Sequence, residues 1–213
     1  MPIEQEAKFA VQSVKELRGK LETLGSLHTQ CRFERNLLFD TPAHDLKKRG
    51  ELLRLRETDT VLLTWKRPAP HSGVAAGIKA MEEVETPVND FEAMRRILRG
   101  LGFIEVLWYE KFREVWTLGD ALVCLDILPF GEFVEIEGEP ETIARAAVLL
   151  GLDMADAQAL TYPAIVSNHG SKTGNLPVKA VFPERAMDRA ATDAGTSPYV
   201  ATATGTSGKS DRS

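Results

Sequence analysis

The chain has 213 residues, of which 43% are hydrophobic and 27% charged, a composition typical of a soluble globular protein. Its formal net charge of −5 and sequence pI near 5.5 argue against a general nucleic-acid binder. No apolar run approaches the ~20 residues of a membrane span, and no basic segment followed by an apolar one opens the chain. We therefore expect a cytoplasmic protein with no nucleic-acid or membrane partner.

The first part of the chain is expected to alternate strands with a helix. Residues 3–9 alternate apolar and charged side chains, as a strand with one buried face does. Ser13 and Glu16 form a capping box for a helix that Gly25 ends. Further strands are expected at 31–39, 51–57, 61–67 and 78–86, and a loop at 68–77.

The second part is expected to contain further helices and strands, followed by a disordered segment. Asn89 should begin a helix, and Pro140 a later one that runs to about Leu150. Strands are expected at 106–118, 121–128 and 131–138, and a short helical piece at 153–160. From residue 167 small and polar residues dominate without a sustained apolar period, so we expect a domain at 1–166 and a disordered tail at 167–213. Many hairpins with few helices predict an α+β fold with a barrel or a strongly curved sheet.

Charged residues recur at every second position of the expected strands, where side chains share one face. For a single strand, a solvated face is the simplest interpretation. Three strands carry paired carboxylates, which repel each other, while their opposite faces are bulky enough to pack under helices. The whole set therefore favours a closed barrel with its charges inside.

A charged interior is costly unless ligands neutralise it. Mg²⁺ prefers oxygen ligands, usually carboxylates together with substrate phosphates, and arginine and lysine suit polyphosphate oxygens. This combination predicts a metal-dependent site for a triphosphate. The four histidines lack the spacing of a zinc site, and Cys31 and Cys124 are expected to be reduced.

Six ordered segments over residues 3–138 resemble one family. They read EQEAK at 4–8, LFDTP at 38–42 followed by LRLR at 53–56, TWK at 64–66, EEVE at 82–85, YEKFR at 109–113 and FVEIEG at 133–138. In this respect the sequence is similar to the CYTH family, also called triphosphate tunnel metalloenzymes, which includes class IV adenylyl cyclases and thiamine triphosphatases.

The resemblance implies a closed tunnel of eight antiparallel strands that holds one or two Mg²⁺ or Mn²⁺ ions and a triphosphate. The implied metal-side carboxylates are Glu4, Glu6, Glu83, Glu85, Asp126, Glu135 and Glu137. The implied triphosphate contacts are Lys8, Arg54, Arg56, Lys66, Lys79, Lys111 and Arg113, with Lys66 and Lys111 as catalytic residues. Many relatives have an arginine where this chain has Met81, and Lys79 is expected to replace it.

The resemblance leaves the reaction open. A cyclase would convert ATP to cyclic AMP and pyrophosphate, and the wording of the later motifs favours it slightly. A phosphohydrolase would release orthophosphate from inorganic triphosphate or thiamine triphosphate. A non-catalytic domain that senses polyphosphate or nucleotide is less favoured, because all three E-x-E pairs are intact. The sequence also leaves a homodimer open.

Overall fold

The computed structural model describes residues 3–70, 77–158, 160–170 and 177–183, without the side chains of Leu27 and His28. The strands are β1 (Ile3–Val11), β2 (Ser26–Asp40), β3 (Leu52–Glu57), β4 (Val61–Pro68), β5 (Ile78–Val88), β6 (Ile104–Leu118), β7 (Ala121–Leu128), β8 (Gly131–Glu137) and β9 (Val178–Ala180). The helices are α1 (Val14–Leu24), α2 (Asp45–Lys48), α3 (Phe91–Gly100), α4 (Pro140–Leu150) and α5 (Tyr162–His169), with a 3-10 turn at Met154–Asp156.

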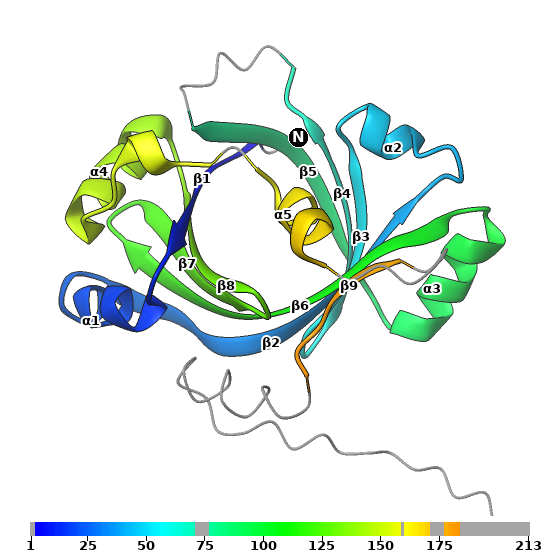
Figure 1. The fold of residues 1–213 in the computed structure, drawn as a ribbon, viewed down its shortest axis with the longest axis horizontal. Coiled ribbons are helices and arrows are strands. Elements are labelled where there is room, and N and C mark those ends of the chain that lie inside the picture. The colour runs from blue at the N-terminus through cyan, green and yellow to red at the C-terminus, as the bar shows by residue number, and fades with distance from the viewer. Residues whose placement is uncertain (1–2, 71–76, 159, 171–176, 184–213) are drawn as a thin grey trace, which may run out of the picture.

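Eight of these strands form a closed antiparallel ring. The order is β2-β3-β4-β5-β1-β8-β7-β6, and β6 pairs back with β2, which closes the ring (Figure 1). The short β9 adds to β6 in parallel, outside this order. The predicted α+β fold with a closed eight-stranded antiparallel sheet and helices outside is therefore confirmed.

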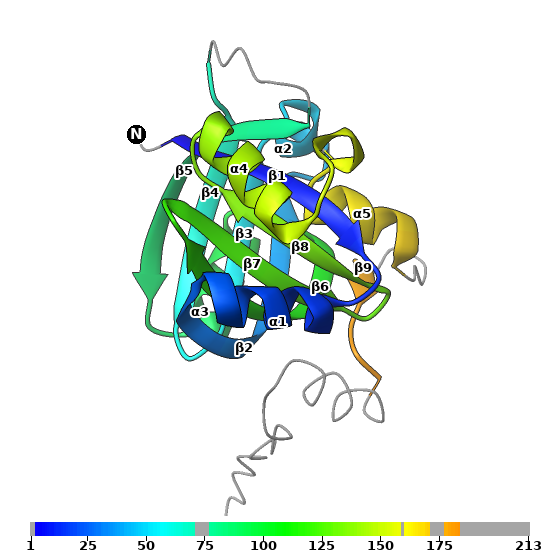
Figure 2. The same ribbon diagram turned by 90° about the vertical axis from the view of Figure 1, so that its left-hand side faces the viewer.

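The apolar faces of the strands point outward and lie under the helices. Val134 and Ile136 of β8 are fully buried against Leu21 of α1 and Ile143 of α4. Figure 2 shows α1 and α4 lying across the outside of the ring. A second apolar cluster joins α3 to β2 and β3. Since these two clusters lie outside the ring, the alternate side chains of the same strands are left for its interior.

Two helix starts differ from the prediction. Ser13 occupies the N-cap position of α1, but its side chain makes no capping hydrogen bond. The Val14 N–H donates instead to the carboxylate of Glu132, at 2.6 Å, so the capping box is wrong. The second long helix begins at Phe91 and not at residue 89, because Asp90 accepts a hydrogen bond from the Ala93 N–H at 2.7 Å and caps it.

The largest difference concerns the end of the chain. The boundary predicted after residue 166 falls inside α5. After α5 the chain forms β9, which pairs with residues 107–109 of β6, a stretch that β7 does not cover. Val178 and Ala180 of β9 are buried, so the predicted disorder is wrong for 167–170 and 177–183. The rest of the predicted tail, like 71–76 of the predicted loop, lies outside the described residues. The helical piece expected at 153–160 is reduced to the 3-10 turn.

No helix in the described part of the chain has both the length and the apolar character needed to cross a membrane.

Candidate active site

The ring encloses a cavity of about 1540 Å³ whose wall is built from the inward side chains of all eight strands. Every predicted site residue except Asp126 lines this cavity. The bases that line it are Lys8, Arg54, Arg56, Lys66, Lys79, Lys111 and Arg113, and the predicted acids are Glu4, Glu6, Glu83, Glu85, Glu135 and Glu137. We call the bases other than Lys79 the base wall. The alternation read from the sequence thus identified the interior face of the ring.

Three carboxylates come close enough to share one metal ion. Glu4, Glu6 and Glu137 each place an oxygen within 4.8 Å of the others, and we call them the acidic group. Adjacent strands position them, since Glu6 of β1 pairs with Glu137 of β8. Burial raises the pKa of Glu137 to about 7, an effect that Arg113 opposes and the neighbouring acids increase. Carboxylate oxygens that repel one another in this way fit a hard divalent cation.

The other predicted metal carboxylates that line the cavity are engaged by bases. Glu83 lies 2.7 Å from Lys66 Nζ, which also contacts Glu4. Glu85 accepts hydrogen bonds from Thr64 Oγ1 at 2.7 Å and from Arg56 Nη2 at 3.0 Å. A third carboxylate, that of Glu135, lies 2.8 Å from Lys8 Nζ and also contacts Arg113. The structure therefore brings together only part of the predicted ligand set.

Asp126 is fully buried and does not line the cavity, although Cys124 on the same face of β7 does. It accepts two hydrogen bonds from Arg113, at 2.7 Å from Nε and 2.6 Å from Nη2, in a bidentate pair. Lys111 Nζ lies 3.3 Å from it, and the Tyr162 hydroxyl donates to it. Among the described residues Asp126 is outside the group that could share an ion. Its contacts orient bases, in place of the metal contact that the resemblance implies.

Two lysines of the base wall are held against an aromatic ring. Lys8 and Lys111 are 2% and 1% exposed, and their Nζ atoms lie 3.9 and 4.8 Å from the Tyr162 ring centroid. Burial opposes the charge of Lys8, but Glu135, Glu6 and Asp126 together outweigh burial and raise the pKa of this lysine. Tyr162 opens α5, which lies within the outline of the ring in Figure 1.

Lys79 lies in the cavity as expected, next to the acidic group. Its Nζ is 4.0 Å from Glu6 Oε1, and it shares the inward face of β5 with Met81. Burial lowers the pKa of Lys79, and Glu6 offsets this only in part. Lys79 of β5 therefore lies beside the acidic group, whereas the base wall draws its residues from β1, β3, β4 and β6.

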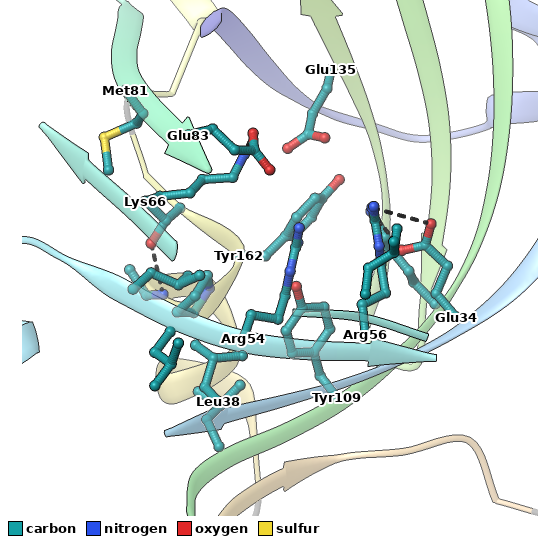
Figure 3. A pocket seen from close by; sticks show the side chains of 18 of the residues that line it. Glu34, Leu38, Arg54, Arg56, Lys66, Met81, Glu83, Tyr109, Glu135 and Tyr162 are labelled. Atoms are coloured by element: carbon teal, nitrogen blue, oxygen red, sulfur yellow. Dashed lines mark hydrogen bonds and ion pairs between the residues drawn. The ribbon is translucent and has the colours of Figure 1, made fainter. Parts of the chain in front are cut away.

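Sequence reasoning missed several interior residues that Figure 3 shows among the bases. Glu34 and Tyr109 lie beside Arg54 and Arg56, and Tyr162 lies between the two sides of the cavity. Glu34 follows the same period of two that identified the other strands, so that signal was present. Tyr162 had no such signal, because it lies on a short helix after the last strand of the ring.

Unsatisfied polar atoms gather on β2 and β3. The buried side-chain atoms that lack a hydrogen-bond partner within the described residues are Glu34 Oε2, Asn36 Nδ2 and Oδ1, Arg54 Nε and Arg56 Nε. Buried polar atoms are normally paired, so this gathering indicates a place prepared for a ligand. Two guanidinium N–H groups among them are suited to anionic oxygens.

The comparison with known families agrees with this geometry. The CYTH domain family model matches residues 2–150, which is most of the chain. The protein belongs to the CYTH family.

Individual relatives point to the same group. A protein from Methanocaldococcus jannaschii, whose name proposes an adenylate cyclase, is 30% identical over 137 residues, covering 63% of this chain and 76% of that protein. A Vibrio parahaemolyticus structure, also described as a proposed adenylate cyclase, has a TM-score of 0.63 at 22% identity and covers 78% of this chain and 98% of its own. A Hippeastrum structure is described as a proposed adenylyl cyclase with a dominant triphosphatase activity. It has a TM-score of 0.59 at 21% identity, and the match covers 79% of this chain and 96% of that chain.

Proposed function

We propose that the protein is a metal-dependent enzyme that acts on a triphosphate inside the ring, most like a class IV adenylyl cyclase that converts ATP to cyclic AMP and pyrophosphate. One observation carries this proposal. The closed ring holds a group of three adjacent carboxylates and a wall of buried and half-buried bases around one cavity. Neither set alone points to a triphosphate, but a metal–triphosphate complex satisfies both.

The acidic and the basic residues of the cavity have different roles in this proposal. Mg²⁺ or Mn²⁺, held by the acidic group, would neutralise charge on the phosphate oxygens when bound. Arg54 and Arg56 present free Nε–H groups for phosphate oxygens. Lys66 and Lys111 are preorganised by the carboxylates they contact, which favours stabilisation of charge that develops during the reaction.

The second candidate is a phosphohydrolase that releases orthophosphate from inorganic triphosphate or thiamine triphosphate. The Hippeastrum protein, with its dominant triphosphatase activity, favours this candidate because its fold is shared. Both reactions use the same bases and differ in whether a ribose hydroxyl or a water attacks. A non-catalytic sensing domain is less favoured, since such a domain does not need the acidic group. A homodimer remains a proposal.

Product analysis tests the proposal and separates the two reactions. Purified protein is incubated with ATP, inorganic triphosphate or thiamine triphosphate, with Mg²⁺, Mn²⁺ or a chelator. The cyclase proposal predicts a cyclic nucleotide and pyrophosphate from ATP, with inorganic triphosphate acting as a competitive inhibitor. Orthophosphate release without any cyclic product would replace the cyclase with the phosphohydrolase. Full turnover in excess chelator would overturn the metal-dependent site.

A further inference from the structure

A carboxylate stands inside the base wall, where the sequence analysis expected only cations. Glu34 of β2 is paired with Lys111 of β6 in the strand register, and it lines the cavity while 5% exposed. Its Oε2 lies 3.5 Å from Lys111 Nζ. Its Oε1 lies 4.0 Å from Arg56 Nη1, and Figure 3 shows these two side chains next to each other. An anion is thus built into the surface that we propose to bind phosphate.

Glu34 is ionised in the ligand-free protein. Burial alone would raise its pKa, but Lys111, Arg113 and Arg56 outweigh burial and lower the pKa to about 2. It lies outside the acidic group, so it is not placed to share an ion with those carboxylates. Its Oε2 accepts no hydrogen bond from the described residues. Glu34 therefore acts on the base wall through its charge.

A triphosphate that binds Arg56 and Lys111 must share these bases with Glu34. Its oxygens would come within a few ångströms of the Glu34 carboxylate, and like charges at that distance repel. Salt screens this repulsion weakly, because the groups are buried. A divalent ion on the triphosphate removes two negative charges from the complex and reduces the repulsion. The penalty thus falls most heavily on polyanions without metal.

We propose that Glu34 is a specificity-determining residue that weakens the binding of metal-free polyanions and so selects the metal complex of the substrate. This inference rests on the proposed function. Without Glu34 the base wall would hold any free polyphosphate more tightly, and an anionic product would leave more slowly.

Calorimetric titration with inorganic triphosphate tests this role. The Glu34→Gln variant keeps the size of the side chain and removes its charge. In chelator it should bind triphosphate about tenfold more tightly than wild type. In the presence of Mg²⁺ the increase in affinity over wild type should be smaller. Its melting temperature without ligand should fall, because the bases lose an internal counter-charge. A merely structural residue would lower both stability and affinity.

Three further variants sharpen the test. Glu114→Gln removes a similarly buried carboxylate, 6% exposed, that pairs with Arg18 outside the cavity, so it should leave affinity unchanged. Glu34→Asp keeps the charge and should bind like wild type. Glu34→Leu is a second charge-free variant for use if Glu34→Gln does not fold.

The outcomes separate this inference from the proposed function. If wild type binds triphosphate and the charge-free variants bind it equally or more weakly, the role of Glu34 is overturned and the triphosphate site stands. If neither wild type nor the charge-free variants bind triphosphate, both proposals are overturned. The role of Glu34 is supported if the charge-free variants bind metal-free triphosphate more tightly than wild type while Glu114→Gln and Glu34→Asp do not.

Discussion

Asp126 and Glu137 are acids on neighbouring strands, yet their surroundings give them opposite electrostatic roles. Asp126 is surrounded by donors from Arg113, Lys111 and Tyr162, whereas Glu137 faces the other members of the acidic group. Removing a charge that neutralises buried bases leaves those bases unpaired, but removing one of several repelling acids relieves repulsion. The two residues should therefore respond differently to the same isosteric change.

Asp126→Asn should lower the free energy of unfolding by about 3 kcal/mol, because Arg113 and Lys111 lose a buried partner. Glu137→Gln should leave ligand-free stability unchanged or higher, and weaken Mn²⁺ binding by about tenfold or more. Urea unfolding measures the first effect, and titration of free Mn²⁺ by electron paramagnetic resonance measures the second. Weakened Mn²⁺ binding in Asp126→Asn with full stability would restore Asp126 as a metal ligand.

The raised pKa of Glu137 predicts a pH dependence of stability without metal. Its folded-state pKa, about 7, is above the ordinary value of 4.5, so between these values the folded state binds the proton more tightly. The stability that this group contributes is complete below pH 4.5 and is lost as the pH rises through 7. From pH 5 to pH 8, wild type should lose about 2 kcal/mol of unfolding free energy relative to Glu137→Gln. Parallel pH profiles for the two proteins in chelator would contradict this assignment.

At the scale of elements, the strands of the ring could be predicted and the additions to it could not. Alternation with a period of two placed the strand expected at 51–57 to within one residue, because Leu53 and Leu55 alternate there with Arg54 and Arg56. α5 and β9 were missed because they are short, and because β9 exists only where β6 extends past β7. That partner is a feature of the tertiary structure, which local periodicity does not encode.

The contribution of β9 can be measured with two valines. Val178 is 7% exposed within a cluster that includes Tyr162 and Tyr109, whereas Val181 is 39% exposed. Val178→Ala should therefore lower the free energy of unfolding by about 1–2 kcal/mol. Val181→Ala should change it by less than about 0.5 kcal/mol. Equal effects of the two substitutions in urea unfolding would show that β9 does not pack in solution as it does in the structure.

For the molecule as a whole, the interior could be predicted as a set of charges but not as a network. The alternation identified which residues face inward and favoured a closed barrel, and the resemblance supplied the number of strands and the expected role of each residue. The pairing of each base with a particular acid, such as Lys8 with Glu135, depends on strands that are distant in sequence. The carboxylate of Glu34 was missed because the strand at 31–39 was predicted, but its inward and outward faces were not assigned.

A preformed network of this kind should be stabilised further by its ligand. Inorganic triphosphate at 100 times its dissociation constant should add about 2.7 kcal/mol to wild-type stability. The gain should be smaller for Arg56→Ala, which removes a base from the cavity. Arg95→Ala breaks a bidentate pair with Glu105 and should keep the full gain while lowering basal stability. Thermal unfolding with and without triphosphate measures each difference, and an undiminished gain in Arg56→Ala would remove this residue from the phosphate contacts.

The central claim is that one cavity joins a metal ion to a triphosphate, and anomalous diffraction tests it most directly. Crystals grown with Mn²⁺ and inorganic triphosphate would be measured near the manganese absorption edge. The account predicts an anomalous peak at coordination distance, about 2.2 Å, from oxygens of the acidic group, with phosphate density running from it along Arg54, Arg56 and Lys111. Triphosphate bound outside the ring, or manganese away from Glu4, Glu6 and Glu137, would contradict it.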